Sequence, residues 1–387
     1  VHRHVGGGAP PFLGHDGGDG VGILGLTHDG DPADRRAGQG GLEGPGEHRS
    51  AGHREQQLVA IGAHAAAAAG GGDQQMHKRT LRGDGLTRNP SIQSARKNPG
   101  HEPVQGPMRA LFLIPGDGVS QLQALPAAAA TAEQLGFALQ VACPPAFASL
   151  WTLLPAVEKV IPFNPQDASL ADWTNLLGCV REPDFQVCVN LGPSRAMELV
   201  LAMSHIPTRI ASSGFSATSR VTAPAGGWPA QALAAWLRPI GVSLNAADFR
   251  LSLPAAVLQQ VAEQLPPGDG PLLLLAPAGH AADWPAAQWQ TLAPRILPTL
   301  PNLRTLQLQA GAGMGLRERA ALVASSDVVL ASDPLTIELA LLSGVPLVAL
   351  GREAASLPTR ADVKGVAPAT GLGQLEPAVV LQALGLG

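Results

Sequence analysis

The chain has 387 residues, a formal net charge of −4 from 26 Lys+Arg and 30 Asp+Glu, and three cysteines. This balance provides no basic field, which excludes nucleic-acid binding as the expected function. The odd number of cysteines, each in an apolar context, predicts small core residues in a reducing compartment. No apolar run reaches membrane-spanning length and no basic start precedes an apolar segment, so we expect a cytoplasmic protein.

The first 107 residues differ in composition from the rest. They hold 24 of the 46 glycines and 9 of the 11 histidines, with Phe12 as their one aromatic residue and no cysteine. A segment so poor in large apolar side chains cannot offset its chain entropy, so we predict disorder over 1–107. The scattered histidines lack zinc-type spacing, and no metal is expected. Because Met108 directly precedes an apolar strand, we hypothesise that it is the native start and that the residues before it are untranslated upstream sequence.

From Met108 onward, apolar runs that fit strands buried on both faces alternate with helical segments. This alternation is typical of a parallel, doubly wound sheet. The expected strands cover 109–114, 138–142, 157–162, 185–190 and 208–211, and the expected helices cover 119–136, 147–154, 170–180 and 194–203.

A second series of the same kind follows. A polar loop at 214–227 precedes the helices expected at 228–239 and 254–265, and the Pro/Gly cluster at 266–270 is the best domain boundary. We therefore predict two Rossmann-like domains, 108–267 and 271–387, with a ligand cleft between them. The second domain has strands expected at 272–276, 303–308, 327–331 and 346–350, and helices at 284–297, 316–324, 334–344 and 375–384.

Two acidic residues accompany the strand at 327–331. Ser332 and Asp333 follow this strand at the start of a helix, where an anionic ligand is held favourably. Alternatively, Asp333 caps that helix. Glu338 lies five residues further on, as a second ligand-side group or as a solvated charge.

Polar residues also follow two strands of the first domain. Asp117, flanked by Gly116 and Gly118, comes after the first strand, where a carboxylate can act as a general base or can cap the next helix. Ser194 and Arg195 open a helix after the strand at 185–190, as an anion site or as a cap beside an exposed arginine.

The loops of the second domain add three candidates. His280 lies in the loop after the strand at 272–276, on the expected ligand side. The glycine loop at 311–315 lacks the complete dinucleotide pattern and is interpreted as a flexible turn. Glu318 follows it, either as a ligand contact or as an acidic residue favoured at a helix N-terminus.

Several of these segments, taken together, resemble glycosyltransferase family 9, the lipopolysaccharide heptosyltransferases. The opening strand with Gly116-Asp117, the segment Ser194-Arg195 and the helix start Trp284-Pro285 are similar to segments of that family. The stretch from Ser332 to Gly351 is similar to the family's Asp-Thr-Gly-Leu-x-His-Leu-Ala … Pro … Leu-Phe-Gly segment. The resemblance covers the chain from Met108 to about Leu350, in the same order.

The resemblance implies a GT-B fold, with two Rossmann-like domains whose parallel sheets face a cleft. It implies inverting transfer of a sugar from an ADP-linked nucleotide sugar to a lipopolysaccharide or other lipid-linked surface glycan, without metal or cofactor, and is compatible with peripheral contact at the inner membrane. Asp117 would be the general base. The implied nucleotide-sugar-binding residues are Gly116, Ser194, Arg195, His280, Trp284, Glu318, Ser332, Asp333 and Glu338.

The chain departs from the family pattern at the leaving-group site. The family's lysine falls on Ala282, its Thr-Gly pair falls on Pro334-Leu335, and its histidine falls on Glu338. A proline has no N–H for a phosphate, and a carboxylate repels one. Three interpretations stay open: a transferase with another donor or with compensation by Arg195 or Arg317, a GT-B-like binding protein that has lost donor-phosphate chemistry, and a nucleotide-sugar epimerase.

Overall fold

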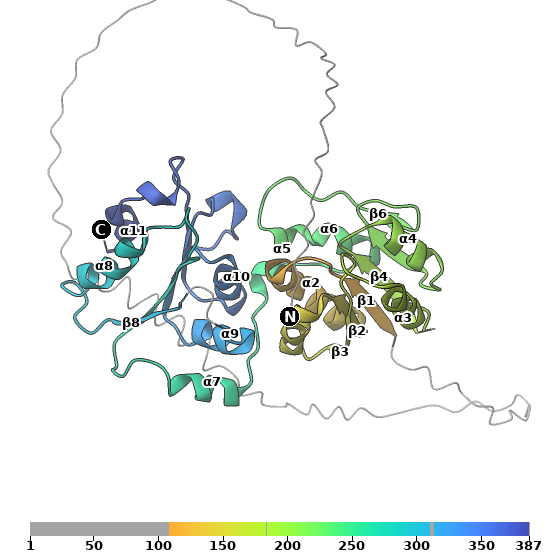
Figure 1. Ribbon diagram of the computed structural model, residues 1–387, viewed down its shortest axis with the longest axis horizontal. Coiled ribbons are helices and arrows are strands. Elements are labelled where there is room, and N and C mark those ends of the chain that lie inside the picture. The colour runs from red at the N-terminus through yellow and green to blue at the C-terminus, as the bar shows by residue number, and fades with distance from the viewer. Residues whose placement is uncertain (1–107, 183, 310–312, 387) are drawn as a thin grey trace, which may run out of the picture. The chain divides into compact units, whose positions relative to one another are not determined.

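The computed structural model describes residues 108–182, 184–309 and 313–386, so the predicted disorder of 1–107 lies outside the described residues. Within this part, eleven strands form two parallel sheets (Figure 1). The prediction of two parallel α/β sheets is therefore confirmed. The strands of the first sheet have the order β3-β2-β1-β4-β5-β6, and those of the second have the order β11-β10-β9-β7-β8.

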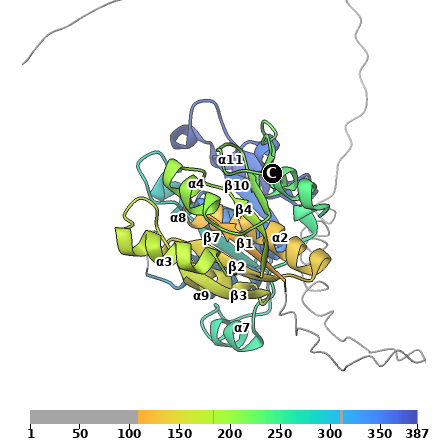
Figure 2. The ribbon, with the colours of Figure 1, turned by 90° about the vertical axis from the view of Figure 1, so that its right-hand side faces the viewer.

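Five strands of the first sheet form where the apolar runs were expected, and the sixth, β6, lies in the predicted loop at 214–227 (Figure 2). Alternate residues of its central strand face opposite layers: Phe112 belongs to the core beneath α2, whereas Leu111 and Leu113 belong to the core beneath α3 and α4. Both faces are thus covered, which explains the continuous apolar runs. The strands are β1 (Arg109–Leu113), β2 (Ala138–Cys143), β3 (Val157–Pro162), β4 (Phe185–Asn190), β5 (Thr208–Ala211) and β6 (Ser219–Arg220).

The helices of this half begin and end at clear capping signals. Helix α2 is capped by Asp117 at its start and ends at Gly136, whose φ of 67° is left-handed, while Ser169 and Asp172 form a capping box on α3. The helix expected at 147–154 is a 3-10 helix, η1, and the one expected at 228–239 is broken into three short turns. These elements are α2 (Gly118–Leu135), η1 (Pro145–Leu153), α3 (Leu170–Val180), α4 (Arg195–Ala202), α5 (Pro229–Ala232), α6 (Ala234–Leu237) and η2 (Arg238–Ile240).

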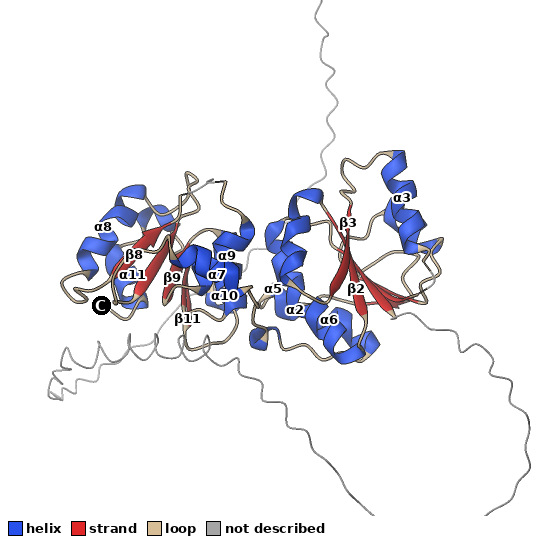
Figure 3. Ribbon diagram, turned by 90° about the horizontal axis from the view of Figure 1, so that it is seen from below, coloured by secondary structure: helices blue, strands red, loops and turns tan. Residues whose placement is uncertain are grey.

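The second sheet is covered on both faces as well (Figure 3). One face packs against α9 and α10, and the other packs against α8 and α11 through Leu273, Leu275 and Trp289. Its elements are β7 (Leu272–Ala276), α8 (Ala286–Ile296), β8 (Arg304–Gln307), α9 (Leu316–Ala324), β9 (Val328–Ala331), α10 (Pro334–Ser343), β10 (Leu347–Leu350), β11 (Val363–Val366) and α11 (Pro377–Ala383).

The connection between the two series contains η3 (Ala246–Asp248) and α7 (Ala255–Ala262). Helix α7 packs against α9, a helix of the second sheet, and the backbone N–H of Leu251 donates to the carbonyl of Leu342. Residues that precede Pro266 thus already contact helices of the second βα series. The domain boundary at 266–270 stays a prediction.

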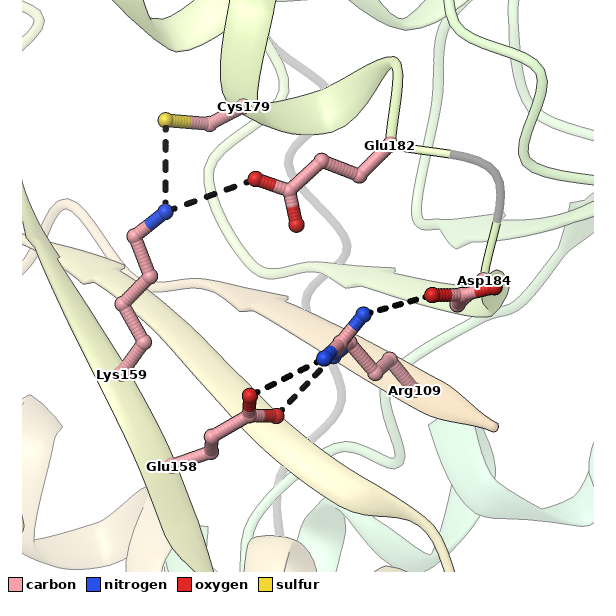
Figure 4. A network of polar contacts seen from close by, with 6 residues as sticks. All are labelled: Arg109, Glu158, Lys159, Cys179, Glu182 and Asp184. Carbon is pink, nitrogen blue, oxygen red and sulfur yellow. Dashed lines mark hydrogen bonds and ion pairs between the residues drawn. The ribbon is translucent and has the colours of Figure 1, made fainter. Parts of the chain in front are cut away.

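Charged residues gather at the amino edge of the first sheet (Figure 4). Arg109 at the start of β1 donates to Glu158 at 2.9 Å and to Asp184 at 2.7 Å, and Lys159 lies 3.5 Å from Glu182. The guanidinium of Arg109 lowers the pKa of Glu158 by donating a hydrogen bond to its carboxylate. This network ties β1, β3 and the start of β4 together at the edge opposite the loops that carry the candidate site.

Candidate functional site

Both sheets reverse their strand order at a point where ligands commonly bind. In the first sheet the switch lies between β1 and β4, and in the second it lies between β7 and β9. In open α/β sheets, the crevice at the carboxyl ends of two such strands is the usual ligand position. The predicted residues Gly116, Asp117 and Ser194 follow the strands of the first switch, and Ser332 and Asp333 follow a strand of the second.

The first switch point opens into a cavity of about 700 Å³. Its wall includes residues after β1 and residues after β4, together with side chains from α3 and from α5 and α6. Such a volume fits a ligand of ordinary small-molecule size. The lining residues are Ile114, Pro115, Gly116, Ser120, Gln123, Pro165, Gln166, Trp173, Leu191, Gly192, Pro193, Ser194, Ala196, Pro229, Leu233 and Trp236.

Asp117 stands next to this cavity as the N-cap of α2. Its carboxylate accepts a hydrogen bond from the backbone N–H of Ser120 at 2.9 Å and one from the Ser120 hydroxyl at 2.7 Å. These bonds lower the pKa of Asp117, the backbone bond contributing most. The side chain is exposed and ionised at neutral pH, so it can accept a proton from a hydroxyl while it caps the helix.

Gln121, a residue that the sequence did not single out, holds the turn that carries Asp117. Its buried amide donates to the carbonyls of Ile114 and Gly116 at 2.7 and 3.1 Å, and its oxygen accepts from the indole of Trp151 at 2.9 Å. The sequence signal for this role was a glutamine among the apolar residues of α2. Gln121 is a positioning residue for the turn.

The second wall of the cavity begins at Ser194. Its hydroxyl accepts from the backbone N–H of Met197 and caps α4, as the alternative interpretation expected, while Arg195 is exposed on the first turn. Below them the buried carboxylate of Glu198 accepts from the backbone N–H and the hydroxyl of Ser216, which fixes the following loop. Arg195 does not line the cavity.

The second switch point is built from the loops after β7 and β9. The hydroxyl of Ser332 accepts from the backbone N–H of Ala278 at 2.9 Å, which joins the two loops. Asp283, which the sequence did not single out, is buried, and its carboxylate accepts from the backbone N–H groups of Gly279 and Trp284. His280 is exposed at the tip of this loop.

Asp333 caps α10 and forms an ion pair. One carboxylate oxygen accepts from the backbone N–H of Thr336 at 2.9 Å and from its hydroxyl at 2.6 Å, and Arg319 donates to the same oxygen at 2.9 Å. The capping alternative is therefore confirmed. The arginine paired with this carboxylate is Arg319, which the sequence did not single out. Arg317, expected as a compensating cation for the donor, is exposed, and Glu318 is half-buried in the first turn of α9.

Glu338 is fully buried in the middle of α10. Its carboxylate accepts from the Gln123 amide at 2.8 Å and from the Trp228 indole at 3.0 Å, and a nitrogen of Arg352 lies 3.5 Å away. Burial raises the pKa of Glu338. The interpretation of Glu338 as a solvated charge is wrong, because its neighbours cover it completely.

Trp284 belongs to the core of the second half. Its indole donates to the carbonyl of Leu375 at 2.8 Å, and its ring packs edge-on against Trp289 with centroids 5.3 Å apart. The structure thus brings Gly116 and Ser194 to one cavity and joins Ser332 to the β7 loop, whereas the side chains of Trp284 and Glu338 are enclosed by protein. Gly311 and Ala312 of the glycine loop lie outside the described residues.

In the described part of the chain, no three His, Cys, Asp or Glu side chains gather as they would to hold a metal ion. The helices described there include none that is long and apolar enough to span a membrane.

Two parallel Rossmann-like sheets, each with a switch point at its carboxyl edge, define a protein of the GT-B fold class. The sequence itself matches no protein-family model and no curated protein. Among solved structures, the fold is similar to a family 9 glycosyltransferase from Veillonella parvula, with a TM-score of 0.58 and 13% identity over 71% of this chain and 95% of that one.

Two further structures are from E. coli. The ADP-heptose lipopolysaccharide heptosyltransferase II has a TM-score of 0.55 at 16% identity, covering 72% of this chain and 97% of that one. Heptosyltransferase WaaC with ADP-2-deoxy-2-fluoro heptose has a TM-score of 0.53 at 16% identity, covering 72% of this chain and 99% of that one. At such identities the likeness establishes the fold, and it agrees with the resemblance found in the sequence.

Proposed function

We propose that this protein is an inverting glycosyltransferase that moves a sugar from a nucleotide sugar, ADP-linked as in the heptosyltransferases, to a hydroxyl of a lipid-linked surface glycan. The observation that carries the proposal is the position of Asp117, an ionised and accessible carboxylate at the switch point of the first sheet, beside a cavity large enough for an acceptor. The family resemblance and the shared fold support it.

The reaction needs one direct displacement. Asp117 takes the proton of the acceptor hydroxyl. The oxygen of that hydroxyl forms a bond to the anomeric carbon of the donor, and the bond from that carbon to the diphosphate breaks. The nucleoside diphosphate leaves with the bonding electrons, and the configuration inverts. We assign the donor to the loops after β7 and β9 and to the start of α9, where the exposed Arg317 can meet its charge.

The experiment that tests the base is a change of Asp117 to Asn in the full chain. Asparagine caps a helix about as well as aspartate, so α2 and the turn are kept while the base is lost. We expect nucleoside diphosphate release to fall by roughly 10²–10⁴, the usual contribution of general base catalysis. Undiminished release by Asp117→Asn would refute the assignment, and Asp269→Asn, an exposed carboxylate in the loop before β7, is the matched control.

A second function keeps specific support. Asp333 is committed to a helix cap and an ion pair with Arg319, Ala282 carries no charge, and Pro334 offers no N–H. These features favour a GT-B-like binding protein that no longer stabilises a leaving diphosphate. The two functions separate by turnover, since a binding protein retains its ligand without releasing a nucleoside diphosphate.

A further inference from the structure

The cavity beside Asp117 has a wall that carries no formal charge. Of the residues that line it, Ser120, Gln123, Gln166 and Ser194 are polar, and the rest are apolar residues or glycines. Lysine, arginine, histidine and acidic residues are all missing from that set. The large side chains of the wall, Trp173 and Trp236, come from different elements.

Three of the four polar side chains in the wall are already engaged. The Ser120 hydroxyl donates to Asp117 at 2.7 Å, the Gln123 amide donates to Glu338 at 2.8 Å, and the Ser194 hydroxyl accepts from Met197 at 3.2 Å. What these side chains and Gln166 still offer a ligand is neutral, with no ionic group among them. A charged group that enters such a site without a partner pays a large desolvation cost.

Two charges of opposite sign flank the wall: Asp117 follows Gly116, and the exposed Arg195 lies between Ser194 and Ala196. Asp117 follows Gly116 in the chain, and its carboxylate accepts a hydrogen bond from Ser120. Both Gly116 and Ser120 line the cavity, so Asp117 lies next to it. The lining residues themselves include no cation that could pair with an acceptor phosphate or carboxylate inside the cavity. A hydroxyl at the rim, by contrast, can donate to Asp117.

We infer that the acceptor group held in this cavity is uncharged and largely apolar, with one hydroxyl directed to Asp117 and an aromatic or aliphatic body against Trp173, Trp236 and Leu233. This inference rests on the proposed transfer from a nucleotide sugar and revises its acceptor, because it places a hydroxyl on an aromatic or aliphatic body where the proposed function has a glycan. It distinguishes the protein from a transferase whose acceptor presents phosphate or carboxylate groups to the first domain.

The test uses two ring systems that differ by one charge, 2-naphthol and 6-hydroxy-2-naphthoate, titrated into the full chain at pH 7 by calorimetry. The phenolic hydroxyl is neutral at this pH in both, and the second compound carries a carboxylate. We expect 2-naphthol to bind at least about tenfold more tightly, since an unpaired buried charge costs more than the factor of ten that corresponds to about 1.4 kcal/mol.

A pair of variants on one helix checks the location. Ala196→Arg places a cation in the wall of the cavity, whereas Ala202→Arg places the same charge at an exposed position at the far end of α4. We expect Ala196→Arg to abolish the preference for 2-naphthol and Ala202→Arg to keep it.

Three results would overturn the inference. The unmodified chain could bind 6-hydroxy-2-naphthoate as tightly as 2-naphthol or more tightly, it could bind neither compound, or the two arginine variants could have equal effects. If a nucleotide sugar binds and the preference is absent, this inference alone fails. If no nucleotide sugar is bound, the proposed function fails, and the assignment of an acceptor falls with it.

Discussion

Replacing Glu338 by alanine should destabilise the protein strongly. The carboxylate is fully buried and is the acceptor for Gln123 and for the buried indole of Trp228, with Arg352 3.5 Å away. Arg352 is a quarter exposed, so the loss comes mainly from the donors that Glu338 satisfies. Leaving a buried donor without a partner costs about 1–3 kcal/mol, and we expect the free energy of unfolding to fall by about this amount in Glu338→Ala.

Glu338 should also make the free energy of unfolding depend on pH. Burial raises the pKa of Glu338 in the folded state above its ordinary value of 4.5, so the folded chain retains this proton where the unfolded chain has lost it. The contribution of Glu338 to the free energy of unfolding therefore decreases as the pH rises from about 4.5 through the pKa that the group has in the folded state. Glu338→Gln, which has no proton to lose, should remove this decrease.

The assay is urea unfolding monitored by tryptophan fluorescence across that pH range, with Glu133→Ala, an exposed glutamate on α2, as the control. A loss below about 1 kcal/mol in Glu338→Ala, or identical pH profiles for the unmodified chain and Glu338→Gln, would refute the reasoning.

Three further predictions concern other parts of the molecule. Gly270→Ala should cost about 1–3 kcal/mol, because its new Cβ would lie 1.7 Å from the carbonyl oxygen of Asn302, while Gly373→Ala, with open space around it, should be nearly neutral in the same unfolding assay. At pH 8 a thiol reagent should label one cysteine of the native chain, Cys179, which is partly exposed. Cys143 and Cys188 should stay unlabelled, because burial raises the pKa of Cys143 to about 12 and also raises the pKa of Cys188. All three should react in urea, and rapid labelling of either buried thiol in the native chain would contradict the prediction. Arg319→Ala should lower the unfolding free energy by about 1.5–3 kcal/mol through loss of its charged hydrogen bond to Asp333, whereas exposed Arg317→Ala should change it little, and equal effects of the two would count against the pairing.

Much of the fold could be predicted because its signals are local. Buried parallel strands are continuous apolar runs, and Asp117, Ser169 and Asp333 are caps that precede their helices by one residue. The strands that were missed, β6 and β11, are short and lie at sheet edges, where Lys364 and Gly365 interrupt the apolar pattern. The helix expected at 228–239 is broken at Leu233, where no Gly or Pro signals a break, and at Arg238, which Pro239 follows.

The site was only partly predictable, because its contacts join residues far apart in the chain. Glu338 accepts from Gln123, 215 residues away, and from Trp228, 110 residues away, so no local pattern could show that it is enclosed. The pairing of Arg319 with Asp333 was not predicted either, because it joins the first turns of two different helices. The cavity beside Asp117 depends on side chains from several elements, which only the folded chain assembles.

The most direct test of the central claim is calorimetric titration of the full chain with an ADP-sugar, and with UDP- and GDP-sugars for comparison. A glycosyltransferase of this fold should bind one nucleotide sugar per chain, with the same affinity in Asp117→Asn, because that residue acts on the acceptor. Saturable one-to-one binding unaffected by Asp117→Asn is the predicted result. No binding of any of the three nucleotide sugars would contradict the claim.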